Sequence, residues 1–346
     1  MNAWVETTWA TRYGVLFKVA GVVLLLGLLL GMPLFVGSYV LTMFVFILIY
    51  SLLTMGLGLL IGWAGQFSLG QGALFGVGAY VSGVLSAKFH VNPWIALVCA
   101  AVVTGCVAYV LGKPFLSVPG YKVGFVTLGF SYMMYSIISR VEYVGGHDGF
   151  AGIQSFAIGK LILNKDYQFY YLCLVIVGIV LLVNRNFVNS RLGKQAKAID
   201  IFSGGSIVAA ESLGIDTGAL KTRMFTIAGV YAGIAGSLYA HYMTQIHPAP
   251  FDVWGSIIVL LMVIMGGVQS LWGGIVGAAT YYLLRELITY VLGEGAPMGW
   301  QYLIYGIVVA GILLVFPRGL MGLVSRLWLV ILRRFSPAAM RGSRGV

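Results

Sequence analysis

The sequence predicts an all-α polytopic membrane protein of about ten transmembrane helices, some of them broken at glycines, with both termini in the cytoplasm. Of its 346 residues, 60% are hydrophobic and only 9% are charged, whereas an ordinary soluble domain is about 25% charged. A soluble core cannot bury so many apolar side chains. Glycine occurs 48 times, about twice its usual ~7% share. Because lipid does not drive helices together, this excess indicates close helix packing, broken helices or both.

Ten apolar stretches approach the ~20 residues that a bilayer span requires. No small-residue cleavage site follows the first stretch, so we expect a retained span and not a signal peptide. Lys113, Pro114 and Pro119 predict a short turn after the fourth stretch. The expected spans cover about 15–36, 38–61, 69–88, 93–112, 122–139, 167–184, 223–243, 254–268, 272–292 and 300–316.

The charged residues orient these spans. Segment 185–223 carries six Lys and Arg against three acidic residues, and the tail 317–346 carries six arginines and no acidic residue. Basic residues in short loops are retained in the cytoplasm, so both stretches are predicted to lie inside. Both termini are then cytoplasmic, and the less basic loops 140–166, 244–253 and 293–299 face outside. The basic, amphipathic stretch 323–335 either lies on the membrane surface or continues the last helix.

Composition and motifs exclude several functional classes. The net charge of +11 is concentrated in the two cytoplasmic stretches, so it does not indicate binding to nucleic acid. Cys99, Cys106 and Cys173 lie in apolar stretches, and the four histidines have no ligand spacing, so no metal or cofactor is expected. No catalytic cluster is present, which disfavours a membrane enzyme. The nearest match to a phosphate-binding loop, Gly193-Lys194-Gln195, lacks the first glycine and the hydroxyl residue that the motif requires.

Segment 185–223 contains its own small element. Gly204-Gly205 interrupts the chain, Ser206 can cap a helix, and Ile207–Leu213 can form about two helical turns before Gly214 ends them. Two interpretations are open. The segment is either a solvated connecting loop or a docking helix for a cytoplasmic partner.

Two glycine-rich stretches, 62–80 and 266–277, interrupt the pattern of spans near their cytoplasmic ends. Unwound backbone at membrane depth survives only where it is buried in protein or lines a wet cavity, and transporters build their pathways at such breaks. Tight helix crossing explains the glycines but not the polar side chains among them. We therefore expect a translocation pathway lined by Gln66, Ser68, Gln71 and Gln269.

Four further polar or charged residues lie inside expected spans. Thr127 and Ser131, four residues apart, either face the same pathway or bond to their own helix backbone. Arg285 and Glu286 are adjacent, and adjacent helical positions point about 100° apart, so separate partners are expected. An ion pair with another helix is the favoured interpretation over a contact with substrate.

The stretch 62–80, and above all AGQFSLGQGALFGVGAY within it, resembles the signature of branched-chain amino-acid ABC permeases of the second-permease (LivM) type. Five further motifs follow in the order of that family, and the resemblance extends over about residues 35–323. They are YKVGFVTLGF from Tyr121, GGHDGFAGI from Gly145, AAESLGI from Ala209, GGVQSLWGGIVG from Gly266 and FPRGLMGL from Phe316.

The resemblance implies a single permease domain over residues 1–346 in a bacterial inner membrane. It also implies a second, homologous permease, two cytoplasmic ATP-binding subunits that hydrolyse ATP, and a periplasmic substrate-binding protein. Segment 185–223 then corresponds to the coupling segment that docks on an ATPase subunit. The residues of this chain that match or begin that motif are Ser206, Ala209, Ala210, Glu211 and Gly214.

Two departures from the family pattern leave room for another substrate or ATPase partner. The segment before AAESLGI is longer than usual, and Gln71 stands where histidine is common. Related permeases carry urea or short amides, which is one alternative. A secondary transporter that works without ATP is another, but Glu286 is the only deeply placed carboxylate to support it.

Overall fold

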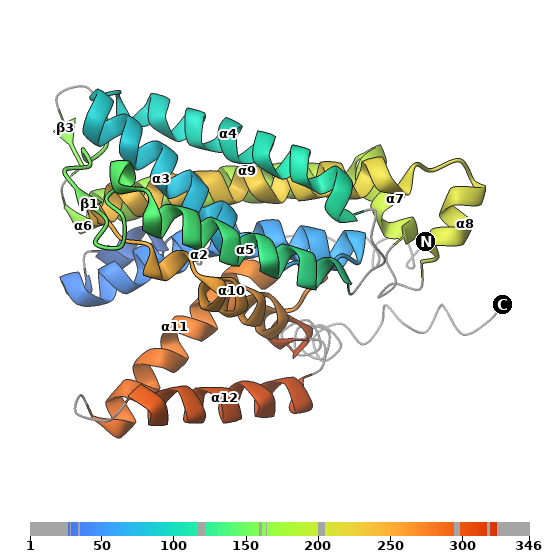
Figure 1. Cartoon of the computed structure of the whole chain (residues 1–346). Helices are drawn as coiled ribbons and strands as arrows, with labels where there is room; N and C mark the ends of the chain where they lie inside the picture. The colour runs from blue at the N-terminus through green and yellow to red at the C-terminus, as the bar shows by residue number, and fades with distance from the viewer. Residues whose placement is uncertain are drawn as a thin grey trace, which may run out of the picture.

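The computed structural model describes residues 27, 29–33, 35–116, 122–158, 161–163, 165–199, 205–293, 298–316 and 319–323. Most of the first expected span, Pro119, Gly204 and the basic stretch 323–335 beyond its first residue lie outside this set. The described chain forms a helical bundle (Figure 1). Its long helices are α2 (Ser38–Ala64), α3 (Gln71–Phe89), α4 (Pro93–Leu116), α5 (Lys122–Arg140), α6 (Asp166–Asn189), α9 (Thr217–Met243), α10 (Val253–Gly266), α11 (Gly273–Leu292) and α12 (Met298–Val315).

Five of the described helices are long and apolar enough to cross a membrane, namely α2, α3, α4, α6 and α11. The chain is therefore a helical protein with several membrane spans. Helix α10 has only 14 residues, or about 21 Å, which is shorter than the ~30 Å hydrocarbon core. The full set of ten spans remains a prediction.

Helix α9 lies at the centre of the bundle and packs against α2, α3 and α4. Small residues allow the close approach. A Cβ added at Gly233 would lie 2.7 Å from the Ala100 carbonyl oxygen on α4, and one at Gly78 on α3 would lie 2.6 Å from the Gly233 Cα. The backbones of three helices meet there, as glycine-rich membrane helices are expected to.

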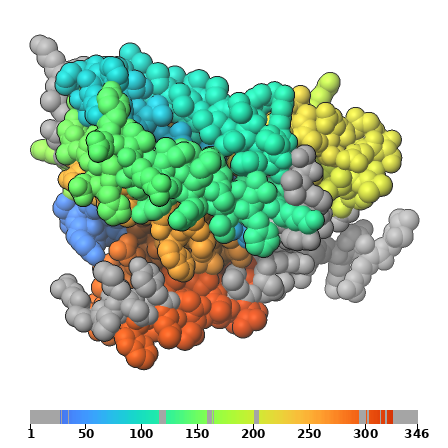
Figure 2. Space-filling model, in the orientation of Figure 1, coloured from blue at the N-terminus to red at the C-terminus, as the bar shows by residue number. Residues whose placement is uncertain are grey.

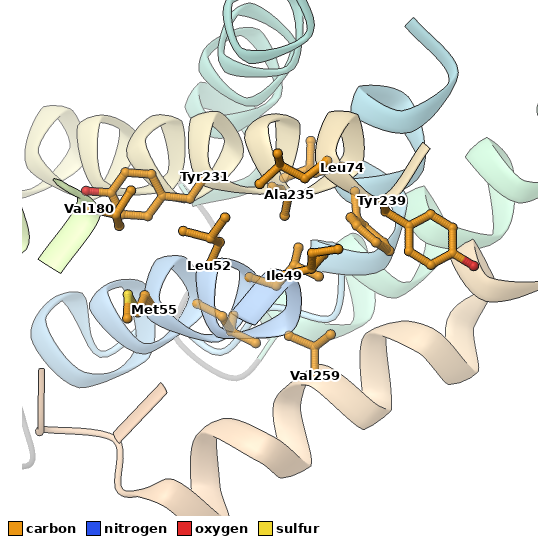
Figure 3. Close-up of a cluster of buried hydrophobic side chains, with 14 of the residues drawn as sticks. Ile49, Leu52, Met55, Leu74, Val180, Tyr231, Ala235, Tyr239 and Val259 are labelled. Carbon is orange, nitrogen blue, oxygen red and sulfur yellow. The ribbon is translucent and has the colours of Figure 1, made fainter. Parts of the chain in front are cut away.

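Large apolar side chains fill the space beside this contact (Figure 3). Ile49 and Leu52 of α2 pack with Leu74 of α3, and all three are fully buried. Aromatic rings extend the core, with the Phe75 and Tyr239 ring centroids 5.3 Å apart. In Figure 1, α11 and α12 reach away from this core as an arm.

At one end of the bundle, the loop between α5 and α6 is more ordered than the sequence predicts. It contains the short helix η1 (Glu142–Val144) and the strands β1 (Phe150–Ala151), β2 (Ala157–Ile158) and β3 (Leu161–Ile162). Strand β1 pairs antiparallel with β4 (Gln245–Ile246), and β2 pairs with β3. The β1–β4 pair ties the two expected outer loops together. A further short helix, η3 (Ala249–Phe251), precedes α10.

Three expectations need correction. No turn occurs at Lys113-Pro114, because α4 continues to Leu116 with Pro114 inside it. Segment 185–223 is largely helical, since α6 ends only at Asn189 and an unexpected helix α7 (Arg191–Ile199) follows. Glu286 accepts hydrogen bonds from the Tyr39 hydroxyl at 2.9 and 3.0 Å. The Tyr39 hydroxyl is therefore the hydrogen-bond partner of the Glu286 carboxylate. Among the described residues, Glu286 makes no ion pair.

Candidate functional site

The non-helical segment 65–70 between α2 and α3 is held in place by hydroxyl groups of α5. Helix α2 ends at Ala64, and its C-cap residue Gly65 has a φ of 61°, a conformation that glycine adopts without strain. The Thr127 Oγ1 accepts a hydrogen bond from the Leu69 N–H at 2.9 Å, and the Ser131 Oγ donates to the Leu69 carbonyl at 2.6 Å. Thr127 also bonds to its own helix at the Val123 carbonyl. Thr127 therefore bonds to its own helix backbone, which was one of the two alternatives, and it also bonds to the break between α2 and α3.

The three polar residues that the sequence singles out here are all buried. Gln66 is 1% exposed, and Ser68 and Gln71 are 0% exposed. Ser68 Oγ accepts from the Gly70 N–H, and Gln71 Nε2 donates to the Ala228 carbonyl of α9 at 3.0 Å. The Oε1 atoms of Gln66 and Gln71 have no partner within the described structure. Buried polar atoms without partners are uncommon and call for an explanation.

Ser256 of α10 joins Ser68, Thr127 and Ser131 at this break, and we call these four residues the hydroxyl cluster. The sequence did not predict Ser256. Its Oγ accepts from the Gly72 N–H at 3.0 Å and lies 3.3 Å from the Ser131 Oγ. A lone serine in an apolar stretch carries no signal of its own. Only the passage of α10 beside the start of α3 brings it to the break.

The second break, between α10 and α11, contacts the last turn of α2, just before the first break. A Cβ added at Gly62 would lie 2.2 Å from the Val268 carbonyl oxygen, and one at Gly319 would lie 2.5 Å from the Gly267 Cα. The two glycine-rich motifs and the Phe316 motif are therefore neighbours. Gln269 does not share this burial, because its side chain is exposed, and the structure does not bring it into the hydroxyl cluster.

The predicted short helix in segment 185–223 is present as α8 (Ile207–Ser212). Ser206 caps it, with its Oγ accepting from the Ala209 N–H at 3.4 Å. Gly214, at a φ of 79°, takes the chain out of the helix. Together α7 and α8 form the yellow projection at one end of the molecule in Figure 2.

Two large apolar side chains are exposed on α8 and its C-cap residue, beside the exposed polar residues Glu211 and Ser212. Val208 is 74% exposed and Leu213 is 80% exposed, whereas Ala210 is 2% exposed and faces the protein. Glu211 is exposed and accepts from the Thr217 Oγ1 at 2.6 Å, which links α8 to the start of α9. Burial lowers the pKa of Lys221, which precedes the apolar part of α9, and the Glu211 carboxylate opposes this shift.

The described residues contain no group of three His, Cys, Asp or Glu side chains that could hold a metal ion. The geometry offers a polar break inside an apolar bundle, with two buried oxygen atoms that lack partners, and a short helix at one end that exposes Val208 and is followed by the exposed Leu213. Neither arrangement places a nucleophile beside a base.

The comparison with protein families is decisive. The family described as branched-chain amino acid transport system / permease component matches residues 39–316. The chain belongs to this family. The match takes in both breaks, α8 and all the long helices from α2 to α12. No solved structure was found to match the chain.

Several relatives of this permease family are similar over most of the chain. The high-affinity branched-chain amino acid permease proteins LivM of Salmonella typhimurium and Escherichia coli are each 26% identical over 265 residues. That alignment covers 70% of this chain and 61% of each LivM protein, so the chain spans only about three fifths of their length. A probable branched-chain amino acid permease, LivH of Methanocaldococcus jannaschii, is 28% identical over 80% of this chain and 90% of its own length.

Proposed function

We propose that this chain is a permease subunit of an ATP-driven, binding-protein-dependent importer for branched-chain or related amino acids. The observation that carries the proposal is the family match over residues 39–316, with the LivM and LivH relatives in support. The proposed partners are a second permease, two cytoplasmic ATP-binding subunits and a periplasmic binding protein. The proposed location is a bacterial inner membrane, crossed about ten times with both termini inside.

Coupling to the ATPase is assigned to α8. Its exposed Val208 and Leu213 offer an apolar surface to a partner groove, and Ala209 allows close seating there. Ser206 and Gly214 fix where the helix begins and ends. The Glu211–Thr217 hydrogen bond ties its movement to α9, which runs through the centre of the bundle.

The translocation pathway is assigned to the break between α2 and α3. Gln66, Ser68, Gln71 and Thr127 lie there, and the unpartnered Oε1 atoms of Gln66 and Gln71 are buried acceptors that a passing ammonium group or water would reach once the break opens. Neutral donors and acceptors suit a zwitterion that must pass without being held tightly. Gln269 is assigned to the same pathway only in a conformation that turns its side chain inward.

The import proposal is tested in vesicles that contain this chain, its co-expressed permease and ATPase partners, and the binding protein. Glu211→Arg and Gly214→Pro should each abolish binding-protein-stimulated ATP hydrolysis and uptake while the complex still assembles. Glu142→Arg is the matched charge reversal at the opposite end, and it should leave coupling unchanged. Uptake by this chain without ATP, unaffected by either α8 change, would instead support a secondary transporter.

A second candidate is an importer of another small polar solute. A relative named galactose/methyl galactoside import permease protein MglC, from Escherichia coli, is 24% identical over 62% of this chain. Permeases for urea and short amides are a further alternative. Competition of leucine uptake by leucine, isoleucine, valine, urea, acetamide and galactose would separate these classes.

A further inference from the structure

A polar cavity of about 390 Å³ lies between the start of α6 and the end of α9. In Figure 1, these helix ends lie at the end of the bundle opposite α7 and α8. Its volume lies in the ~300–1,000 Å³ range of ligand pockets. We call it the outer cavity. The end of α9, the start of α6 and the loop before α6 form it, and its polar lining residues are Ser155, Lys165, Asp166, His241, Tyr242 and Thr244.

The two charged groups of the outer cavity have opposite signs. Asp166 accepts hydrogen bonds from the Tyr242 hydroxyl at 3.2 Å and from the Ser38 hydroxyl, so its carboxylate is held in place. The Lys165 ammonium lies 5.8 Å from the centroid of the Tyr167 ring, and it makes no ion pair with another described residue. The cavity thus presents one anchored anion and one unpaired cation on consecutive residues.

The floor of the outer cavity is polar but already bonded. His241 is 1% exposed, and its Nδ1 bonds to the Gln154 carbonyl, which can only accept. Its Nε2 lies 2.9 Å from the Ser82 Oγ, which in turn lies 2.7 Å from the Ser237 Oγ. Both ring nitrogens are bonded, so His241 is not free to bind a metal ion. The charged side chains of Lys165 and Asp166 therefore dominate ligand recognition in the outer cavity.

One side of the outer cavity is apolar. Leu163 is 7% exposed and Phe169 is 2% exposed, and both belong to the lining. A ligand with a single charge would leave either Lys165 or Asp166 without an oppositely charged partner. An uncharged sugar would leave both without one. A zwitterion with an aliphatic side chain matches all three features.

We propose that the outer cavity is a receiving site for a free α-amino acid, where Lys165 binds the α-carboxylate and Asp166 binds the α-ammonium group. Leu163 and Phe169 contact the aliphatic side chain. This inference rests on the proposed import function and deepens it, because it gives the permease its own contact with the substrate after release from the binding protein. Lys165, exposed at the mouth, is placed to meet the substrate first.

The test uses the complete importer in lipid nanodiscs, without ATP and without binding protein, and measures ligand binding by saturation-transfer NMR. The probes are leucine, 4-methylpentanoate, which lacks the ammonium group, and 3-methylbutylamine, which lacks the carboxylate. Leucine should bind in the millimolar range, and each analogue should bind about tenfold more weakly or worse, since each loses one charge-assisted contact.

Two variants identify the residues. In Lys165→Gln, leucine should bind no better than 3-methylbutylamine, and in Asp166→Asn it should bind no better than 4-methylpentanoate. General damage to the fold would weaken all three probes together and would not produce this crossed pattern. Lys88→Gln is the matched control, because Lys88 bonds to the Tyr143 carbonyl outside the cavity, and it should bind leucine as the unchanged protein does.

Absence of leucine binding without the binding protein, or leucine selectivity that persists in both variants, would overturn the inference. A separate uptake assay with loaded binding protein distinguishes this failure from failure of the proposed function. Normal ATP-driven leucine uptake with unchanged KM in both variants would reject the outer cavity as a receiving site but would leave the proposed import function standing. Crossed selectivity in nanodiscs without any ATP-driven uptake would support the cavity and reject the importer.

Discussion

Where the chain unwinds between α2 and α3, side chains of α5 provide hydrogen-bond partners for the backbone N–H and carbonyl of Leu69. A buried backbone group without a partner costs about 1–3 kcal/mol, and here both groups of Leu69 are bonded to α5 side chains. The carbonyls of most membrane helices need no such help, because the helix satisfies them itself. Thr127 and Ser131 therefore stabilise the break as well as facing it.

Replacing Ser131 with alanine should destabilise the protein, because the Leu69 carbonyl loses its donor. We expect a loss of about 1–3 kcal/mol in the free energy of unfolding, seen as a lower unfolding temperature of the purified protein in detergent. Ser139→Ala on the same helix is the matched control, since the Ser139 Oγ is buried and already lacks a partner. Equal losses in both variants would show that the bond to Leu69 contributes nothing.

At the scale of elements, apolar length and charge were sufficient to predict where the long helices lie. Nine of the ten expected spans coincide with helices from α2 to α12, within a few residues at most ends. Helix α7 was missed although Leu192, Ala196 and Ile199 repeat at helical spacing, because its charges made it look like a solvated loop. The β1–β4 pair was missed because its paired residues lie 96 (Phe150 with Ile246) and 94 (Ala151 with Gln245) positions apart in the sequence, and each strand has two residues. That pairing depends on tertiary packing.

At the candidate site, too, the sequence predicted the residues that stand out by their polarity but not those that only tertiary packing brings there. Gln66, Ser68, Gln71 and Thr127 stand out in the sequence because polar residues are rare in this chain, and the structure brings them to one place. Gln269 stands out equally but is exposed. Ser256 contributes to the cluster without any sequence signal, because only the path of α10 places it there.

Close approach of α4 and α9 should depend on Gly233. A Cβ there would meet the Ala100 carbonyl oxygen at 2.7 Å and the Ala101 Cα at 3.0 Å, and backbone atoms cannot move aside as side chains do. Gly233→Val should cost about 1–3 kcal/mol by overpacking and should lower the yield of folded protein in size-exclusion chromatography. Gly129→Val on α5 is the control, because nothing lies within 4 Å of its added Cβ; a similar loss there would contradict the packing argument.

Helix α8 should bind its partner through apolar surface. Val208→Glu and Leu213→Glu change two of the most exposed apolar side chains of the described chain, so they should leave folding intact. Each should reduce co-purification of the ATPase subunits and abolish stimulated hydrolysis. Val102→Thr on the exposed face of α4 should have no effect on co-purification. Full complex recovery with both glutamate variants would exclude α8 as the docking element.

At the scale of the whole molecule, the two proposed activities lie at opposite ends of one helix. Helix α9 has 27 residues from Thr217 to Met243, or about 40 Å, more than the ~30 Å hydrocarbon core. Its first turn is bonded to α8, and its last turn supplies His241 and Tyr242 to the outer cavity. If α9 spans the membrane, α8 and the outer cavity must lie on opposite sides of it.

This orientation predicts a clear labelling pattern. In a background where Cys99, Cys106 and Cys173 are replaced by alanine, a cysteine at Asp148 lies in the loop at the cavity end, and one at Ser212 lies on α8. A membrane-impermeant maleimide should label Asp148→Cys in spheroplasts and Ser212→Cys only in inverted vesicles, because the basic residues of segment 185–223 predict that this segment lies in the cytoplasm. Labelling of both from one side would mean that α9 does not cross the bilayer. Labelling of Ser212→Cys from outside alone would reverse the orientation and would place α8 beyond the reach of any cytoplasmic ATPase.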